Sequence, residues 1–321
     1  MTKKILVTGT SVRPELLQPL VEAGYEIINP TNLLSEEELK TALLSCSAYL
    51  LGGDEYASLG ALSSAANLKV VAFLGMGYES FVDAAAAKTL GIAVTNTPGT
   101  LSNSVAEFTV GLVLSSTRKL FLYASEYALG RTGTEEKQRD LSALHVGIVG
   151  LGGIGTRIAE ILRNGFGSHV SYYSRTRKPH LEADLGVSYL DLGSLVATVD
   201  VLIVMTPGNE HTKGLIGQSQ VSALRPGTIV VNTARPEIVD QAALLEGLSS
   251  GQISYAAFDG FYDSNPELTE KLKAYVPTKL MITGHIGSLT SEARDGMARK
   301  ATDSILAVLK TGTDLNIVNG V

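Results

Sequence analysis

The chain has 321 residues, of which 45% are hydrophobic and 18% are charged. These values exclude a disordered protein, and the length allows two domains with large buried cores. The net charge of −6 argues against nucleic-acid binding, because that function needs a basic face. No apolar run is long enough to span a membrane, and no signal peptide is recognisable, so the sequence predicts a cytoplasmic protein.

The chain contains one cysteine, Cys46, which rules out an internal disulfide framework and a cysteine-rich metal site. Its apolar surroundings predict a small buried residue and not a nucleophile. We therefore expect a protein of a reducing compartment that holds no metal.

Short apolar runs alternate with helical patterns from one end of the chain to the other. This alternation predicts parallel sheets covered by helices. A Pro/Gly turn over residues 96–102 precedes a helix over 105–116 that is apolar nearly all round, and a last helix is expected over about 290–309. The expected strands cover residues 4–7, 70–73, 93–95, 145–149, 169–173, 201–205, 228–232, 255–258 and 280–283.

The most informative segment is VGIVGLGGIGTRIAEIL, residues 146–162, in which an apolar run leads into Gly150, Gly152 and Gly155 and then into a helical pattern. In a dinucleotide-binding turn these glycines permit the turn, the approach of a pyrophosphate and close packing of helix on strand. The helix N-terminus presents N–H groups and a favourable dipole to the phosphates. A purely structural turn is the alternative, and the strand–turn–helix context favours the cofactor site.

The strand over residues 169–173 ends where NAD-binding folds usually place Asp or Glu to hold the ribose 2′-hydroxyl. This chain instead continues with Ser174, Arg175, Thr176 and Arg177. A carboxylate would repel a 2′-phosphate, whereas a hydroxyl and two guanidinium groups would bind one. A solvated basic loop is the alternative. The position of the loop favours NADP(H), with NAD(H) still allowed.

Ordered blocks of sequence resemble the D-isomer-specific 2-hydroxyacid dehydrogenases over essentially the whole chain. The resemblance implies an α/β protein of two Rossmann-like, doubly wound parallel-sheet domains with the active site in the cleft between them. The substrate domain would comprise residues 1–101 and 289–321, and the dinucleotide-binding domain residues 102–288. The blocks are LGMGYESFVD (74–83), GIAVTNTPG (91–99), SVAEFTVGLVLSSTR (104–118), VGLGGIG (149–155), VVNTARPEIVD (230–240), AAFDGF (256–261) and TGHIGS (283–288). The stretch YYSRTRK (172–178) is similar to the NADP-preferring glyoxylate and hydroxypyruvate reductases of that family.

The resemblance implies that Arg235 and His285 carry the chemistry. Arg235 matches the arginine of the family's NTARG block and would clamp the carboxylate of a 2-oxo acid through its planar fork. His285 matches the catalytic histidine, which acts as the general acid in reduction. Pro236 and Gly284 depart from the family, which commonly has glycine and proline there. The other histidines are expected to be structural: His145, His169, His180 and His211.

The glutamate that orients the histidine in the family has no counterpart in register. The family runs D-V-F-x-x-E-P, whereas this chain runs DGFYDSNP over residues 259–266, which is one residue longer. Asp263 is the nearest acid and the candidate replacement. A histidine without a carboxylate partner has a pKa of about 6.5, so the rate of reduction would then fall as the pH rises through neutrality. A plateau above neutral pH would instead identify Asp263 as the partner.

The resemblance also assigns contacts to substrate and cofactor. The loop formed by Leu74, Gly75, Met76 and Gly77 matches the one whose backbone N–H groups receive the substrate carboxylate, with an ordinary turn as the alternative. The segment Asp54, Glu55 and Tyr56 is expected at the pocket mouth, or in a solvated loop. At the pocket mouth its two acids would disfavour a substrate with a second anionic group, such as a phosphate. The expected cofactor contacts are Val105, Gly150, Gly152, Gly153, Ile154, Gly155, Ser174, Arg175, Thr176, Arg177, Thr206, Pro207, Thr233, Ala234 and Asp259.

Together these features predict an enzyme that reduces a small 2-oxo acid with NADPH to the (R)-2-hydroxy acid, with glyoxylate and hydroxypyruvate as the first candidates. The family and the apolar helix over residues 105–116 suggest a homodimer. A formate- or phosphite-type dehydrogenase on the same fold is one alternative. A dinucleotide-sensing protein similar to the corepressors of this fold is another. The missing glutamate favours the sensor, and the intact Arg235 and His285 disfavour it.

Overall fold

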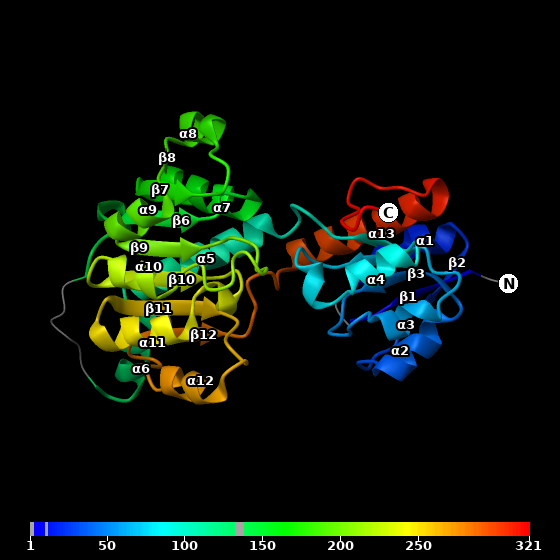
Figure 1. The fold of residues 1–321 in the computed structure, drawn as a ribbon, viewed down its shortest axis with the longest axis horizontal. Helices are drawn as coiled ribbons and strands as arrows, with labels where there is room; N and C mark the ends of the chain where they lie inside the picture. The colour runs from blue at the N-terminus through cyan, green and yellow to red at the C-terminus, as the bar shows by residue number, and fades with distance from the viewer. Residues whose placement is uncertain (1–2, 10–11, 132–137) are drawn as a thin grey trace. The chain divides into compact units, whose positions relative to one another are not determined.

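The structure is a computed structural model that describes residues 3–9, 12–131 and 138–321. The chain divides into two compact units, Met1–Leu101 with Leu289–Val321, and Ser102–Ser288. Each unit is built on one sheet whose named strands all pair in parallel, with helices packed on it (Figure 1). The predicted α/β class with two parallel sheets is therefore confirmed. The assignment of substrate and cofactor to the two units stays a prediction.

The first unit has a five-stranded sheet in the order β2-β1-β3-β4-β5. Apolar side chains alternate along the strands, so each sheet face has its own core. Helices α2 and α3 pack on one face, and α1 and α13 on the other. The strands are β1 (Lys3–Val7), β2 (Tyr25–Ile28), β3 (Cys46–Leu51), β4 (Val70–Phe73) and β5 (Ala93–Thr95), and the helices are α1 (Gln18–Glu22), α2 (Glu36–Leu43), α3 (Leu59–Ser63), α4 (Ala84–Thr89) and α13 (Ser291–Thr311).

Helix α13 ties the end of the chain to the N-terminal sheet. Its Ile305 and Val308 are buried with Ile5 and Val7 of β1, which explains why this unit is discontinuous in sequence. The side chain of Thr290 accepts a hydrogen bond from the Ala293 amide at 3.1 Å and caps the helix start. The helix ends at Thr311, before a left-handed Gly312 and two residues beyond the end expected from the sequence.

The second unit has a seven-stranded sheet in the order β12-β11-β10-β9-β6-β7-β8. The chain leaves β6 toward one side of the sheet and later returns to build the other side from β9, so the strand order reverses between these two strands. In open parallel sheets, ligands bind beside such a switch point, outside the carboxyl ends of the strands. The strands are β6 (His145–Val149), β7 (His169–Tyr173), β8 (Ser188–Tyr189), β9 (Val201–Val204), β10 (Thr228–Asn232), β11 (Ile253–Asp259) and β12 (Leu280–Thr283).

Helices cover both faces of this second sheet (Figure 1). The buried side chain of Val149 lies in a core shared with α9 to α12, whereas its neighbour Ile148 faces α7, because successive strand residues point to opposite faces. Helix α5 packs against α7, β10 and β11. The helices are α5 (Ser102–Thr117), α6 (Leu120–Ala128), α7 (Gly153–Glu160), α8 (Pro179–Leu185), α9 (Leu192–Thr198), α10 (Gln218–Ala223), α11 (Gln241–Ser250) and α12 (Pro266–Lys273).

All the strands expected from the sequence are present, with shifts of one or two residues at some ends. The structure adds β2, β3 and β8, which the sequence analysis does not include. Strands β2 and β8 lie at sheet edges and bury few side chains, so their apolar signal is weak. Strand β3 is buried, but Ser47 and Tyr49 interrupt its apolar run. Cys46 at its start is fully buried, as expected.

We predict opposite stability effects for two glycine-to-alanine changes in the second unit. A Cβ at Gly147 on β6 would lie 2.8 Å from Val199 Cγ1 and 3.2 Å from Leu195 Cδ1, so Gly147→Ala should cost about 1–3 kcal/mol. A Cβ at the exposed Gly111 of α5 meets nothing within 4 Å, so Gly111→Ala should add about 0.5–1 kcal/mol. Chemical denaturation measures both, and shifts of the same sign would contradict this packing.

Candidate active site

The turn after β6 requires two of its glycines. Gly150 has a φ of +109°, and a Cβ there would lie 2.5 Å from the Met205 carbonyl oxygen. A Cβ on Gly155 would lie 2.1 Å from the Gly150 carbonyl oxygen. A larger residue at position 150 would therefore clash with the segment after β9, and one at position 155 would separate α7 from the turn. These contacts hold the loops after β6 and β9 side by side at the switch point.

Between these two positions the turn is open. A Cβ on Gly152, the residue that precedes α7, would meet no heavy atom within 4 Å. The N-cap residue Gly152 has no side chain with which to cap α7, and the first turn of the helix contains no acid. Its first N–H groups and the positive end of its dipole therefore remain available to an anion. Gly153 and Ile154 form the first turn of this helix.

The charged residues of the loop after β7 have different surroundings. The Ser174 hydroxyl donates to the Thr176 carbonyl oxygen at 2.7 Å, which closes the turn. The Arg175 side chain is exposed and forms no ion pair with any residue of the described ranges. The Arg177 guanidinium instead binds the Glu182 carboxylate with two hydrogen bonds. The two arginines of the predicted 2′-phosphate site are therefore not equivalent.

Strands β9 and β10 end in loops that meet at Arg235. Asn232, the last residue of β10, donates to the Arg235 carbonyl oxygen at 2.9 Å and accepts from the Ala234 amide at 3.0 Å, which fixes this turn. The aliphatic part of Arg235 packs so closely on Gly208 that a Cβ there would lie 2.6 Å from Arg235 Cγ. The half-buried guanidinium donates to the Ala234 carbonyl oxygen at 3.0 Å. It forms no salt bridge with a described acid, so its charge remains available.

Other predicted cofactor residues surround these loops. The Thr233 hydroxyl shares a hydrogen bond of 2.7 Å with Thr109 on α5, one turn after the buried Val105. Thr206 and Pro207 follow β9, where the Pro207 carbonyl oxygen accepts from Thr212 at 2.6 Å. The strand order therefore places the loops after β6, β9 and β10 at one edge of the second sheet.

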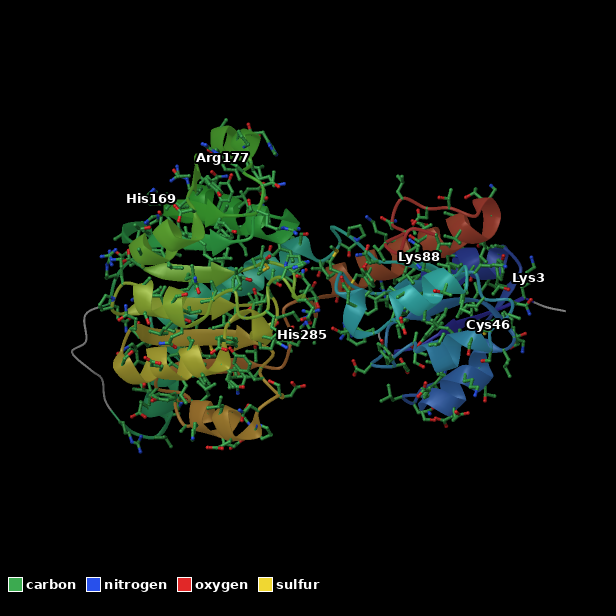
Figure 2. The ribbon with its side chains drawn as sticks, in the orientation of Figure 1. Lys3, Cys46, Lys88, His169, Arg177 and His285 are labelled. Atoms are coloured by element: carbon green, nitrogen blue, oxygen red, sulfur yellow. The ribbon has the colours of Figure 1, made fainter. Side chains whose placement is uncertain are left out.

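Asp259 organises the turn that carries His285. This buried carboxylate accepts hydrogen bonds from the Thr283 hydroxyl at 2.7 Å and from the backbone amides of Ile286 and Gly287, each at 2.8 Å. These bonds tie the segment after β12 to the end of β11. His285 has a left-handed backbone with a φ of +57°, and its side chain is exposed (Figure 2). The predicted cofactor residue Asp259 is therefore also the anchor of the predicted acid.

The longer segment after β11 has a local explanation. The side chain of Asn265 accepts from the Leu268 amide at 3.2 Å and caps α12, and Pro266 occupies the first helical position. The Gly260 turn passes His285, because a Cβ on Gly260 would lie 3.9 Å from His285 Cβ. Asp263 is exposed and has no hydrogen bond to another residue in the described part of the chain. Its pairing with the histidine stays a prediction.

The loop after β4 in the first unit has free backbone donors. Leu74 to Gly77 follow β4, and the carbonyl oxygens of Gly75 and Met76 accept hydrogen bonds from Thr97 and Asn96. The backbone amides of Met76 and Gly77 donate to no acceptor among the described residues. The loop therefore offers two N–H groups to an anion, whereas the carbonyl oxygens of Gly75 and Met76 already have donors.

The structure corrects one expectation about the segment 54–56. Asp54 and Tyr56 are exposed, but Glu55 is buried, and its carboxylate accepts from the Leu34 amide at 3.3 Å. Burial raises the pKa of the neighbouring Tyr49, and Glu55 adds to this effect. Glu55 is therefore part of the core and does not line an open, solvated loop.

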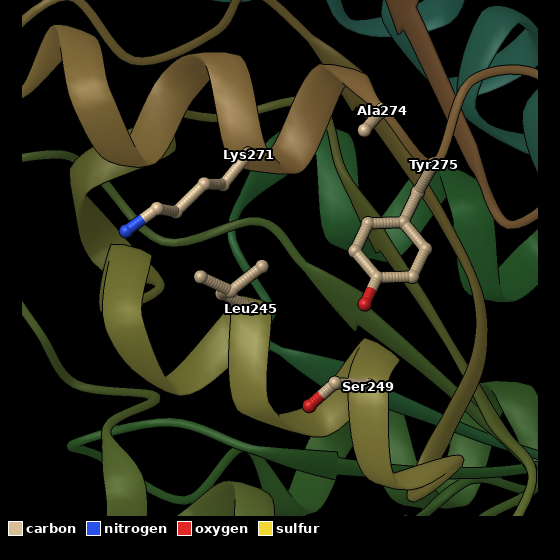
Figure 3. Close-up of a pocket in the computed structure, with 5 residues that line it drawn as sticks. All are labelled: Leu245, Ser249, Lys271, Ala274 and Tyr275. Atoms are coloured by element: carbon tan, nitrogen blue, oxygen red, sulfur yellow. The ribbon is translucent and has the colours of Figure 1, made fainter.

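Two other histidines and a surface pocket lie away from these loops. His145 and His169 stack at 4.1 Å at the starts of β6 and β7, at the edge opposite to His285 (Figure 2). A pocket of about 580 Å³ lies on the outer surface of α11 and α12, among Leu245, Ser249, Lys271, Ala274 and Tyr275 (Figure 3). None of these residues belongs to the predicted site. In the described ranges, no group of His, Cys, Asp or Glu could hold a metal ion, and no helix could cross a bilayer.

A seven-stranded parallel sheet with a glycine turn at its switch point is typical of a dinucleotide-binding domain. The sequence profile of the NAD-binding domain of D-isomer-specific 2-hydroxyacid dehydrogenases matches residues 110–287. The chain belongs to this family, and it is an oxidoreductase with a nicotinamide dinucleotide cofactor.

Relatives and solved structures agree with this assignment. A glyoxylate reductase of Aeropyrum pernix is 35% identical over 80% of this chain and 78% of its own length. A glyoxylate reductase of Thermococcus onnurineus is 30% identical over 99% of this chain and 96% of its own. A crystal structure of a Thermus thermophilus protein superposes with a TM-score of 0.86 at 32% identity, and the match covers 98% of this chain and 99% of that one.

We predict that Asp259→Asn disturbs His285 without unfolding the sheet. One amide oxygen replaces two carboxylate oxygens, so at least one of the three hydrogen bonds to the turn is lost. We expect kcat for 2-oxo acid reduction to fall at least about tenfold, because hydrogen bonds to charged groups are worth about 1.5–3 kcal/mol. Thr283→Val removes only one of these bonds and serves as the milder control. A kcat of Asp259→Asn equal to that of the wild type would rule out this anchoring role.

Proposed function

We propose that this protein reduces a small 2-oxo acid of the glyoxylate or hydroxypyruvate type to the (R)-2-hydroxy acid, with NADPH as the preferred cofactor. One observation carries the proposal: the glycine turn, an arginine without an acidic partner in the described ranges and a histidine lie at the carboxyl ends of strands in one sheet. The glyoxylate reductases among its relatives support this substrate class.

The residues present fit the cofactor of the family. The open space at Gly152 and the uncapped start of α7 suit a pyrophosphate. After β7, the half-buried Ser174 and the exposed Arg175 stand where a carboxylate would select against a 2′-phosphate. The bound cofactor supplies the hydride that reduces the carbonyl carbon.

The substrate carboxylate requires donors that hold it in one orientation. Arg235 supplies a planar fork that suits a carboxylate, and Asn232 fixes the backbone turn that carries this side chain. The free amides of Met76 and Gly77 suit the same group, and we propose that they act on the same substrate.

His285 would act as the general acid. It would give its proton to the carbonyl oxygen as the carbon is reduced. The hydrogen bonds of Asp259 to the Ile286 and Gly287 amides hold this turn in place before substrate arrives. Arg235 would stabilise the negative charge that develops on the same oxygen. The homodimer and the cytoplasmic location stay predictions from the sequence.

We expect Arg175→Ala to raise the Michaelis constant for NADPH about tenfold to a hundredfold, because a hydrogen bond to a charged group is worth about 1.5–3 kcal/mol. The Michaelis constant for NADH should not change, since that cofactor lacks the 2′-phosphate. Initial rates with each cofactor at saturating 2-oxo acid measure both values. Equal use of NADH and NADPH by the wild type would refute the assignment of Ser174 and Arg175.

We expect the wild type to oxidise NADPH when glyoxylate or hydroxypyruvate is supplied, and Arg235→Lys to lose at least about tenfold in kcat/KM. Lysine keeps the charge but cannot reproduce the bidentate fork, so the variant separates geometry from charge. Circular dichroism and cofactor affinity of the variant show whether its fold is intact. A variant with the kcat/KM of the wild type would remove Arg235 from the mechanism.

The same assay separates the alternatives. Formate and phosphite are tested with the oxidised cofactor, and turnover of these alone would replace the proposed substrate class. Tight NADPH binding without turnover of any tested acid would instead indicate a dinucleotide sensor.

A further inference from the structure

A carboxylate holds one of the two arginines in the predicted 2′-phosphate loop. Arg177 Nε donates to Glu182 Oε1 at 2.8 Å, and Arg177 Nη2 donates to Glu182 Oε2 at 2.7 Å. Glu182 lies on the short helix α8, which follows the loop directly. This bidentate geometry is the one that a guanidinium also uses to bind a phosphate.

Glu182 is itself fixed from the other side. It accepts a hydrogen bond from the Tyr172 hydroxyl at 2.8 Å, and the same hydroxyl accepts from the Lys178 amide at 2.6 Å. The Arg177 guanidinium, labelled in Figure 2, lies 5.7 Å from the centre of the Tyr189 ring on β8. The carboxylate is therefore part of an ordered network that begins near the end of β7.

The pair is charged at neutral pH. The hydrogen bonds from Arg177 lower the pKa of Glu182 to about 2, and those from Glu182 raise the pKa of Arg177. A formal charge of +1 on Arg177 is therefore balanced by −1 on Glu182. Arg175 has no such partner in the described ranges, so the two arginines offer the 2′-phosphate different charges.

We propose that Glu182 is a specificity-determining residue that withholds Arg177 from the 2′-phosphate and thereby limits the preference of this enzyme for NADPH over NADH. The inference rests on the proposed function, because it assumes that the 2′-phosphate lies at the loop after β7. Two effects act together. The Glu182 carboxylate competes for the fork of Arg177, and its negative charge repels a phosphate placed beside it.

NADH carries a hydroxyl in place of the phosphate, so its binding should be insensitive to both effects. Glu182 would thus lower the affinity for one cofactor and leave the other unchanged. Selectivity between NADPH and NADH is the difference between their binding free energies. A contact that weakens the binding of one cofactor therefore changes selectivity as effectively as a contact that strengthens the binding of the other.

The test is the dissociation constant of Glu182→Gln, measured by calorimetry for NADPH, NADH, 2′,5′-ADP and 5′-AMP without turnover. Glutamine keeps the size of the side chain and an acceptor for Tyr172, but it loses the charge. We expect NADPH and 2′,5′-ADP to bind about tenfold tighter, the gain typical of one added charged hydrogen bond. The affinities for NADH and 5′-AMP should stay within about twofold, because neither contains the 2′-phosphate.

The double variant Glu182→Gln/Arg177→Ala tests whether the released arginine causes the gain. Its affinity for NADPH should return to about the value of the wild type. Glu267→Gln is the matched control, because Glu267 pairs with Lys271 on α12, at the β12 side of the sheet. It should change no affinity. The gain should also shrink as the salt concentration rises.

The outcomes distinguish this inference from the proposed function. If the wild type binds 2′,5′-ADP no better than 5′-AMP, the NADPH preference itself is wrong. If the wild type prefers 2′,5′-ADP but Glu182→Gln binds it equally or more weakly, Glu182 only supports the loop and the inference is overturned. Glu182→Ala provides a second test should the glutamine variant unfold, with the same gain expected.

Discussion

The common direction of the strands in the second sheet is the constraint on which the site depends. Parallel pairing places the carboxyl ends of β6, β7, β9, β10, β11 and β12 at one edge. Residues that are far apart in sequence are therefore placed at the same end of the sheet. The glycine turn, Arg235, Asp259 and His285 each lie at the end of a strand or in the first few positions after it. A rigid sheet fixes their spacing more precisely than flexible loops would.

Two carboxylates then fix residues that the sheet brings to this end. Asp259 uses both oxygens to bind the turn around His285, so that turn is set before any ligand arrives. Glu182 binds Arg177 in the loop after β7 and leaves Arg175 as the exposed cation. Each acid binds a residue or turn of the proposed site, and their effects differ because one fixes a backbone turn and the other neutralises a side chain.

Most of the nucleotide fold could be predicted from the sequence, because its strands are short apolar runs and the glycine spacing is itself a pattern. The edge strand β8 has no buried residue and is not predicted from the sequence. Gly155 is required by a contact within its own turn, whereas the contact of Gly150 with the Met205 carbonyl oxygen joins segments far apart in the sequence. The burial of Glu55 could not be read from the sequence, since it depends on packing against segments far from it in the chain. The pairing of Arg177 with Glu182 depends on where α8 begins and on which side of the helix Glu182 lies. A run of basic residues in the sequence does not show which of them is neutralised.

The most direct test of the proposed chemistry measures where the hydride of the cofactor goes. The enzyme is supplied with NADPH deuterated at C4 of the nicotinamide, in each of its two stereochemical forms, together with glyoxylate or hydroxypyruvate. The account predicts that one form transfers deuterium to C2 of the hydroxy acid, and that the product of hydroxypyruvate has the (R) configuration. Product without deuterium from either form, or no product while NADPH stays bound, would contradict hydride transfer to a 2-oxo acid at this site.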